Sequence, residues 1–274
     1  MQQKTQLDNK LWWFFAIAFA FTWLCQLPLT LASHGLIHDL GWPRAVDWFA
    51  TFGPLLAACL LTCLGEGKDS LIKLLKRGWN IHFERVWWLP TLLLLPTLQY
   101  LAVALGSLIE SGKWPQLTLS PQPGFYLSFL VILVQVIGEE YGWRGYAIGR
   151  LQIRWNALVS SLILGVFWGV WHIQLWMRAG DATRTSPFLA TQFYILTQAI
   201  LYTWLYNNTR ASLLPVLLYH TLDNFLGSKL FGIYDSFASS MAYSIIVFLT
   251  ALVVVLVWGH RTLVREKSYG GNHV

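Results

Sequence analysis

The chain has 274 residues, of which 55% are hydrophobic and 12% are charged, and its mean hydropathy is +0.49. A soluble globular domain carries about 25% charged residues. This composition excludes a water-soluble domain and predicts an integral membrane protein. The net charge of +6 comes largely from Lys and Arg in connecting segments, as membrane topology requires, and gives no reason to expect a nucleic-acid partner.

The apolar runs predict an all-α, polytopic helical bundle. A membrane span needs about 20 apolar residues, and eight runs of that order occur in what we expect to be one integral membrane domain over residues 1–274. The weakest are the fourth and the seventh, because they contain ionisable residues. The predicted spans cover residues 11–32, 46–65, 87–109, 125–145, 156–177, 187–206, 211–228 and 238–259.

The connection between the second and third predicted spans, residues 66–86, is the longest basic segment. Leu71, Leu74, Leu75 and Trp79 recur there at helical spacing among lysines and arginines. This pattern predicts an amphipathic helix that lies in the membrane interface.

Lys and Arg gather on one side of the predicted spans. With the N-terminus inside, the inner side holds 14 of these residues, Arg144 included, and the outer side holds 5. Cytoplasmic segments of membrane proteins are enriched in Lys and Arg. The sequence therefore predicts that both termini lie in the cytoplasm.

Two adjacent glutamates, Glu139 and Glu140, end the apolar run of the fourth predicted span. A charged side chain in hydrocarbon is costly, so such a pair indicates a functional site. Arg144 follows Glu140 by four residues and is placed to neutralise it on the same helix face. Glu139 is then the freer acid, about 100° away around the helix.

Further polar side chains lie in two other predicted spans. His172 is in the fifth, and His220, Asp223 and Asn224 are in the seventh. A helical bundle can bring residues from separate spans to one internal site. His220 and Asn224 are four residues apart and share a helix face.

Glycines recur at four-residue intervals beside these groups, at Gly138 and Gly142 and at Gly165 and Gly169. Small residues at this spacing let membrane helices approach closely. The pattern predicts close contact of the fourth and fifth spans, which would shorten the distance between Glu139 and His172.

The predicted spans place Glu139 and His172 at different depths in the membrane. Glu139 lies near the inner end of its predicted span, and His172 lies far along the next. At 1.5 Å per residue, they meet only if both helices extend or tilt by roughly 10 Å. We expect such an extension.

The polar groups suit two kinds of hydrolysis. In the first, a carboxylate and a histidine activate water while a second histidine and an asparagine donate hydrogen bonds to an oxyanion. In the second, Glu139, His172 and His220 bind zinc and a water molecule. The soluble zinc motif His-Glu-x-x-His is absent, and spacing alone does not choose between them. A proton or ion pathway uses the same residue types.

Three motifs together resemble the CPBP family: Glu139-Glu140-x-x-x-Arg144, an aromatic-x-x-x-His at Trp168–His172, and His220-x-x-x-Asn224. This family comprises the type II CAAX prenyl endopeptidases and their bacterial Abi relatives, some of them linked to bacteriocin processing and self-immunity. The second motif usually begins with Phe, and here it begins with Trp168. That departure puts substrate preference in doubt more than activity.

The resemblance implies an intramembrane endopeptidase of a bacterial plasma membrane, with a site that opens toward the cytoplasm and a peptide or protein substrate. It assigns water activation to Glu139 and His172 and oxyanion binding to His220 and Asn224. Glu140 and Arg144 would support Glu139. In a competing account of the family, Glu139 and the two histidines bind a metal. A non-catalytic immunity or scaffold protein and a proton- or ion-coupled transporter remain alternatives.

Overall fold

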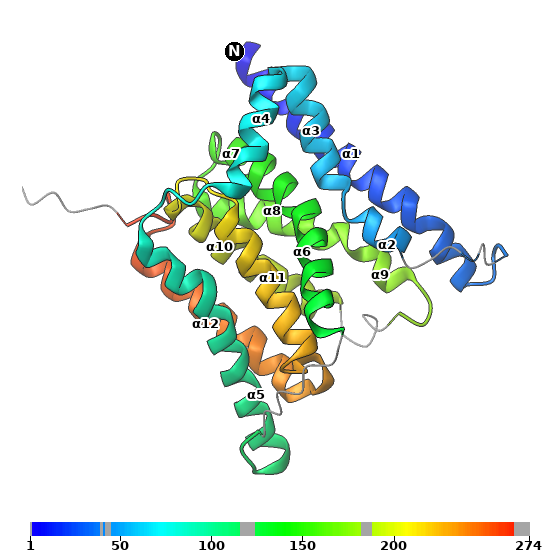
Figure 1. Ribbon diagram of the computed structural model, residues 1–274, viewed down its shortest axis with the longest axis vertical. Coiled ribbons are helices and arrows are strands. Elements are labelled where there is room, and N and C mark those ends of the chain that lie inside the picture. The colour runs from blue at the N-terminus through cyan, green and yellow to red at the C-terminus, as the bar shows by residue number, and fades with distance from the viewer. Residues whose placement is uncertain (1, 39–40, 42–44, 116–123, 182–187, 266–274) are drawn as a thin grey trace, which may run out of the picture.

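The computed structural model describes residues 2–38, 41, 45–115, 124–181 and 188–265, and their regular structure is helical (Figure 1). The all-α prediction is confirmed. The helices are α1 (Gln2–Ser33), α2 (Ala45–Ala50), α3 (Gly53–Glu66), α4 (Lys68–Lys76), α5 (Leu95–Ser111), α6 (Phe125–Gly142), α7 (Gly149–Gln152), α8 (Ala157–Trp171), α9 (Ile173–Met177), α10 (Phe188–Asn208), α11 (Leu214–Lys229) and α12 (Phe237–Trp258).

The predicted number of eight spans is not confirmed. Among the described residues, six helical segments are long and apolar enough to cross a membrane. Helices α10 and α11 fall short because α11 has only 16 residues and because both carry buried polar side chains, such as Gln198 and Asp223. The six segments are Lys10–Ser33, Val46–Glu66, Arg85–Ser111, Phe125–Gln152, Ala157–Met177 and Phe237–Trp258.

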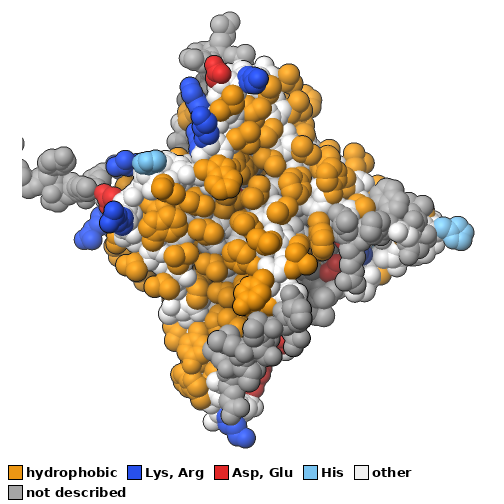
Figure 2. All heavy atoms as spheres, in the orientation of Figure 1, with side chains coloured by type: hydrophobic (Ala, Val, Ile, Leu, Met, Phe, Trp, Pro, Cys, Tyr) orange, Lys and Arg blue, Asp and Glu red, His pale blue; other side chains and the backbone are white. Residues whose placement is uncertain are grey.

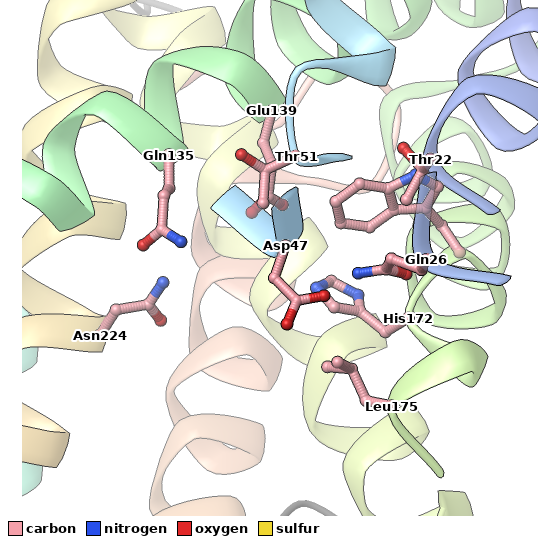
Figure 3. A pocket seen from close by; sticks show the side chains of 10 residues that line it. Thr22, Gln26, Asp47, Thr51, Gln135, Glu139, His172, Leu175 and Asn224 are labelled. Carbon is pink, nitrogen blue, oxygen red and sulfur yellow. The ribbon is translucent and has the colours of Figure 1, made fainter. Parts of the chain in front are cut away.

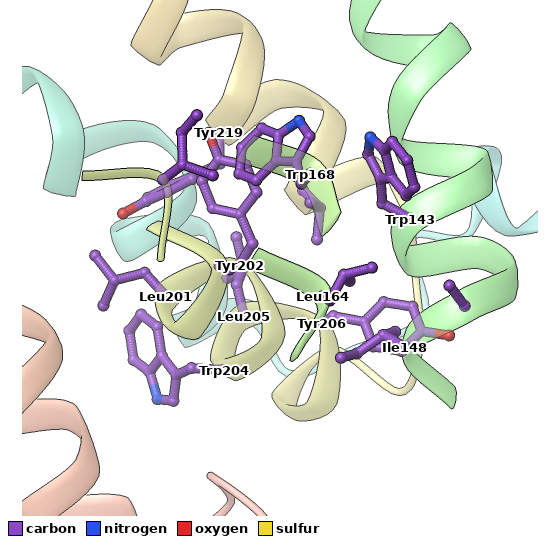
Figure 4. Packing of buried hydrophobic residues seen from close by; sticks show 14 of the residues in the cluster. Trp143, Ile148, Leu164, Trp168, Leu201, Tyr202, Trp204, Leu205, Tyr206 and Tyr219 are labelled. Atoms are coloured by element: carbon purple, nitrogen blue, oxygen red, sulfur yellow. The ribbon is translucent and has the colours of Figure 1, made fainter. Parts of the chain in front are cut away.

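The outer surface of the bundle suits a membrane. Hydrophobic side chains cover most of the face in Figure 2, and Lys and Arg appear at its extremities. Inside, α8 packs along α10, α5 along α12 and α1 along α3, while α6 contacts both α3 and α11. Aromatic rings fill the centre, among them Trp143, Trp168, Tyr202 and Tyr219 (Figure 4).

The bundle has two ends that differ in charge. At the first, which we call the basic end, Lys10 donates a hydrogen bond to the Gly65 carbonyl and Arg150 pairs with Glu66, beside the lysines of α4. At the second, which we call the far end, His34 at the end of α1 contacts the Met177 carbonyl. The chain runs from the basic end to the far end along α1 and returns along α3.

The amphipathic helix predicted in residues 66–86 forms as α4. Its Leu74 is buried and its lysines are exposed. The Tyr141 hydroxyl of α6 donates to the Leu75 carbonyl at 2.7 Å, which ties α4 to the bundle. The interfacial position of this helix stays a prediction.

The predicted glycine contact between the fourth and fifth spans is wrong. A Cβ at Gly138 would lie 2.8 Å from the Thr51 carbonyl oxygen, and one at Gly142 would lie 2.6 Å from the Pro54 backbone, so Gly138 admits the turn between α2 and α3 and Gly142 admits α3. Gly165 and Gly169 instead face α10, which packs along α8. The spacing predicted close packing correctly, but four-residue periodicity does not identify the partner helix.

Candidate active site

One helical hairpin sets the heights of Glu139 and His172. Helix α6 continues through a π-helical segment, Trp143–Ile148, and α7 to Gln152, so the predicted end at residue 145 is seven residues too early. Glu139 lies 13 residues before Gln152, and His172 lies 15 residues after Ala157. At 1.5 Å per residue, both are about 20 Å from the turn. The expected extension is thus found in the helix that carries Glu139, which runs about 10 Å beyond its predicted end, and it brings the two residues to similar heights.

Glu139, His172 and Asn224 line one cavity of about 230 Å³ (Figure 3). They come from α6, from the junction of α8 and α9, and from α11. The structure thus gathers three of the six predicted site residues on one cavity wall. The cavity is lined by Thr22, Gln26, Asp47, Thr51, Gln135, Glu139, Trp171, His172, Leu175 and Asn224.

The Glu139 carboxylate is held by the indole of Trp168. Only 6% of Glu139 is exposed, and its Oε2 accepts a hydrogen bond from Trp168 Nε1 at 2.8 Å. Phe, the usual residue of the family motif, has no such donor. The substitution of Trp for Phe therefore changes the environment of the candidate base directly, and not only the shape of the pocket wall.

The ring of His172 has a defined tautomer. Its Nδ1 lies 2.9 Å from the Trp168 carbonyl oxygen. A carbonyl can only accept, so Nδ1 carries the proton, and Nε2 of the neutral ring bears a lone pair. A histidine held in this way is able to accept a proton from water at Nε2.

Glu140, Arg144 and His220 form a buried cluster behind the cavity. Glu140 Oε1 is 2.8 Å from Arg144 and 2.8 Å from Nδ1 of His220, and both Glu140 and Arg144 are fully buried. The guanidinium lies 4.6 Å from the ring centres of Trp168 and Tyr202. The predicted pairing of Glu140 with Arg144 is confirmed. Arg144 lies inside the bundle and not in a connecting segment, so it was wrongly counted among the Lys and Arg of the inner side.

His220 does not join Asn224 on the cavity wall. Although the two residues share a helix face, Asn224 lines the cavity, whereas His220 directs Nδ1 to Glu140 and packs its ring edge against Trp168, 5.4 Å between centroids. The described residues contain no group of three or more His, Cys, Asp or Glu arranged to hold a metal ion. Glu139, His172 and His220 therefore do not form the predicted zinc ligand set in this arrangement.

Asp223, the other ionisable residue of α11, also lies away from the cavity. Its carboxylate accepts hydrogen bonds from Tyr194 at 2.6 Å, from Gln198 at 2.9 Å and from Gln99 at 3.0 Å. These donors come from α5 and α10 and are neutral. Asp223 thus anchors α11 to its neighbours, and the adjacent Asn224 is fixed relative to the cavity.

Several polar residues of the cavity were missed by sequence reasoning. Asp47 forms a bidentate pair with Arg178, 2.7 Å for each contact, which joins α2 to the segment after α9 at the cavity rim. The hydrogen bonds that Arg178 donates to Asp47 raise the pKa of Arg178, so this cation stays charged. Gln26 and Gln135 lie inside apolar runs, and an isolated amide in such a run is the signal that could have found them.

Two comparisons with known proteins find similar sequences over the part of the chain that carries this site. Residues 121–226 match the family described as type II CAAX prenyl endopeptidase Rce1-like. CAAX prenyl protease 2 of Methanococcus maripaludis is 25% identical over 163 residues, which cover 56% of this chain and 60% of that protein. The chain thus matches less than two thirds of that relative's length. The matched segment starts just before α6, ends two residues after Asn224 and contains all three motifs. Over this segment the chain is therefore similar to the type II CAAX prenyl endopeptidases, the relatives that its three motifs resemble.

Proposed function

We propose that this protein is an intramembrane endopeptidase that hydrolyses peptide bonds of a peptide or protein substrate. The observation that carries the proposal is the meeting of Glu139, His172 and Asn224 on one cavity. A carboxylate and a neutral imidazole are bases for water, and an amide N–H is a donor for an oxyanion. Helices that form the cavity also have membrane-spanning length and apolarity, so the bond would be cut at the level of the bilayer.

In the proposed reaction, Glu139 and His172 hold a water molecule, and one of them takes its proton. The water oxygen bonds to the scissile carbonyl carbon while the carbonyl π electrons move to oxygen. Asn224 donates its amide N–H to the resulting oxyanion. When the intermediate collapses, the C–N bond breaks and the protonated base gives its proton to the leaving amine.

The Glu140–Arg144–His220 cluster supports this pair from behind. Arg144 and His220 satisfy the buried charge of Glu140, and the Trp168 ring that covers Arg144 also donates to Glu139. The geometry favours Asn224 over His220 as the oxyanion donor. Nδ1–H of His220 is given to Glu140, so only a doubly protonated ring has a second N–H to donate.

We propose a metal-independent mechanism, because the described residues contain no group of three or more His, Cys, Asp or Glu arranged to hold a metal ion. The purified protein in proteoliposomes is expected to cleave members of an internally quenched peptide library, and 1,10-phenanthroline is expected to leave the rate unchanged. A zinc protease assayed in parallel provides the control for the chelator. Inhibition by the chelator, with recovery on added Zn²⁺, would contradict the metal-free mechanism. Full cleavage by His172→Ala would contradict the proposed pair.

We also propose that the basic end faces the cytoplasm, with both termini. The described lysines and arginines of α4, of the Arg77–Arg85 connection and of the α10–α11 turn all lie there, as the positive-inside rule requires. The cavity extends from Glu139 at mid-height toward Asp47 and Leu175 at the far end. A site open to the cytoplasm is therefore incompatible with cytoplasmic termini. The proposed orientation gives the cavity access to the outer side of the membrane.

This orientation is tested by cysteine labelling. After Cys25, Cys59 and Cys63 are replaced by Ser, a single cysteine is placed at an exposed position of each end, as Asp69→Cys at the basic end or Lys113→Cys at the far end. A membrane-impermeant maleimide added to intact cells is expected to label Lys113→Cys, and to label Asp69→Cys only after lysis. The reverse pattern would overturn the orientation and leave the proposed chemistry standing.

A further inference from the structure

Gln135 is a polar side chain in an otherwise apolar stretch of α6. Residues 129–138 are apolar apart from this amide. Gln135 is half-buried and lines the cavity, one helical turn before Glu139. A buried amide without a hydrogen-bond partner is unfavourable, and membrane helices keep such groups where they are needed.

No hydrogen bond joins the Gln135 amide to another residue within the described part of the chain. Trp168 and Asp47 differ in this respect, because Trp168 donates to Glu139 and Asp47 accepts from Arg178. The amide of Gln135 is directed into the cavity, where it faces the amide of Asn224 (Figure 3). Its donor and its acceptor are thus both free for a bound molecule.

The spacing from Glu139 suggests what that molecule presents to Gln135. Four residues of α-helix advance about 6 Å along the axis. An extended peptide advances about 3.3 Å per residue, so this distance corresponds to about two residues of substrate. A carboxamide offers one oxygen acceptor and N–H donors, which match the N–H and C=O of a peptide backbone.

We propose that Gln135 binds the substrate backbone about two residues from the scissile bond, with its oxygen accepting from a peptide N–H and its nitrogen donating to a peptide carbonyl. The inference rests on the proposed endopeptidase function and names a substrate-binding residue of the same site. Recognition of this kind reads the extended backbone and not the side chains. It holds the peptide in register between Gln135 and Asn224 while Glu139 and His172 act on the bond.

The test uses Gln135→Met, which keeps the length of the side chain and removes both polar groups. With the most rapidly cleaved peptide of a quenched library as probe, KM is expected to rise about tenfold, as for the loss of one or two hydrogen bonds, while kcat stays within about twofold. Val134→Ala, on the exposed neighbouring position, is the matched control and should change neither constant.

A second measurement separates binding from chemistry. Ester analogues of the probe, each with one peptide N–H replaced by oxygen, are titrated onto Glu139→Gln protein with and without Gln135→Met. One ester about two residues from the scissile bond should weaken binding only when Gln135 is present. Equal effects at every position, or an unchanged KM in Gln135→Met, would overturn the inference.

If Gln135→Met does not fold, the ester series on Glu139→Gln protein alone decides. A series in which no single ester weakens binding more than the others overturns the inference. Failure of the wild-type protein to cleave any library peptide would instead overturn the proposed function itself.

Discussion

Replacing Glu139 by Gln is expected to lower kcat/KM for peptide cleavage by about 10³-fold, within the range that a positioned acid or base contributes. The substitution keeps the size of the side chain and an oxygen that accepts from Trp168 Nε1, so the local structure should persist. It removes the carboxylate that takes the proton of water. The measurement is initial cleavage rate in proteoliposomes, with unfolding temperature as the check on folding.

The matched control is Glu66→Gln. Glu66 is a glutamate with a side-chain partner too, in this case Arg150. It is 39% exposed and lies at the basic end, away from the cavity. Its substitution should leave cleavage within about twofold, because an exposed pair contributes little. Wild-type cleavage by Glu139→Gln would eliminate Glu139 as the base.

Replacing Arg144 by Met is expected to destabilise the protein by about 3–5 kcal/mol, the usual cost of leaving a buried charge without its partner. Arg144 and Glu140 are fully buried and 2.8 Å apart, and the guanidinium also lies between the rings of Trp168 and Tyr202. Met preserves much of the side-chain packing, so the loss should come mainly from the charge. Denaturant titration in detergent micelles measures the free energy of unfolding.

Arg150→Met is the control for Arg144→Met. Arg150 also pairs with a glutamate and lies over a ring, that of Tyr146, but its side chain is 16% exposed and its partner is at the surface. Its loss should cost about 1 kcal/mol or less. The double variant Glu140→Gln/Arg144→Met should be more stable than Arg144→Met alone, because the uncompensated carboxylate is gone. Equal stability of the two arginine variants would show that the buried cluster does not stabilise the fold.

The sequence predicts what depends on local spacing. Composition gives the membrane class, four-residue spacing gives the pairing of Glu140 with Arg144, and an amphipathic pattern gives α4. The end of α6 was misplaced because hydropathy falls at the glutamates, whereas the helix continues through buried polar and aromatic residues to Gln152. Helix boundaries follow backbone hydrogen bonding, which hydropathy does not measure.

What the sequence could not predict depends on which helices are neighbours. Gly142 could face either flanking helix, and it faces α3. His220 and Asn224 share a helix face, yet one ring is turned to Glu140 and the other side chain to the cavity, because neighbouring helices occupy different sides of α11. The contribution of α2 through Asp47 has no periodic signal at all, since this helix has only six residues.

The cavity draws its residues from two parts of the chain, and this has an evolutionary consequence. The segment that matches the protease family, residues 121–226, supplies Glu139, His172 and Asn224, whereas α1 and α2 lie outside it and supply the wall opposite, including Gln26 and Asp47. If the proposed function holds, chemistry and selectivity are encoded in separable stretches of the gene. Substitutions in the first 50 residues would then change which substrates fit while the three motifs stay intact, so relatives with the same motifs would diverge in what they cut.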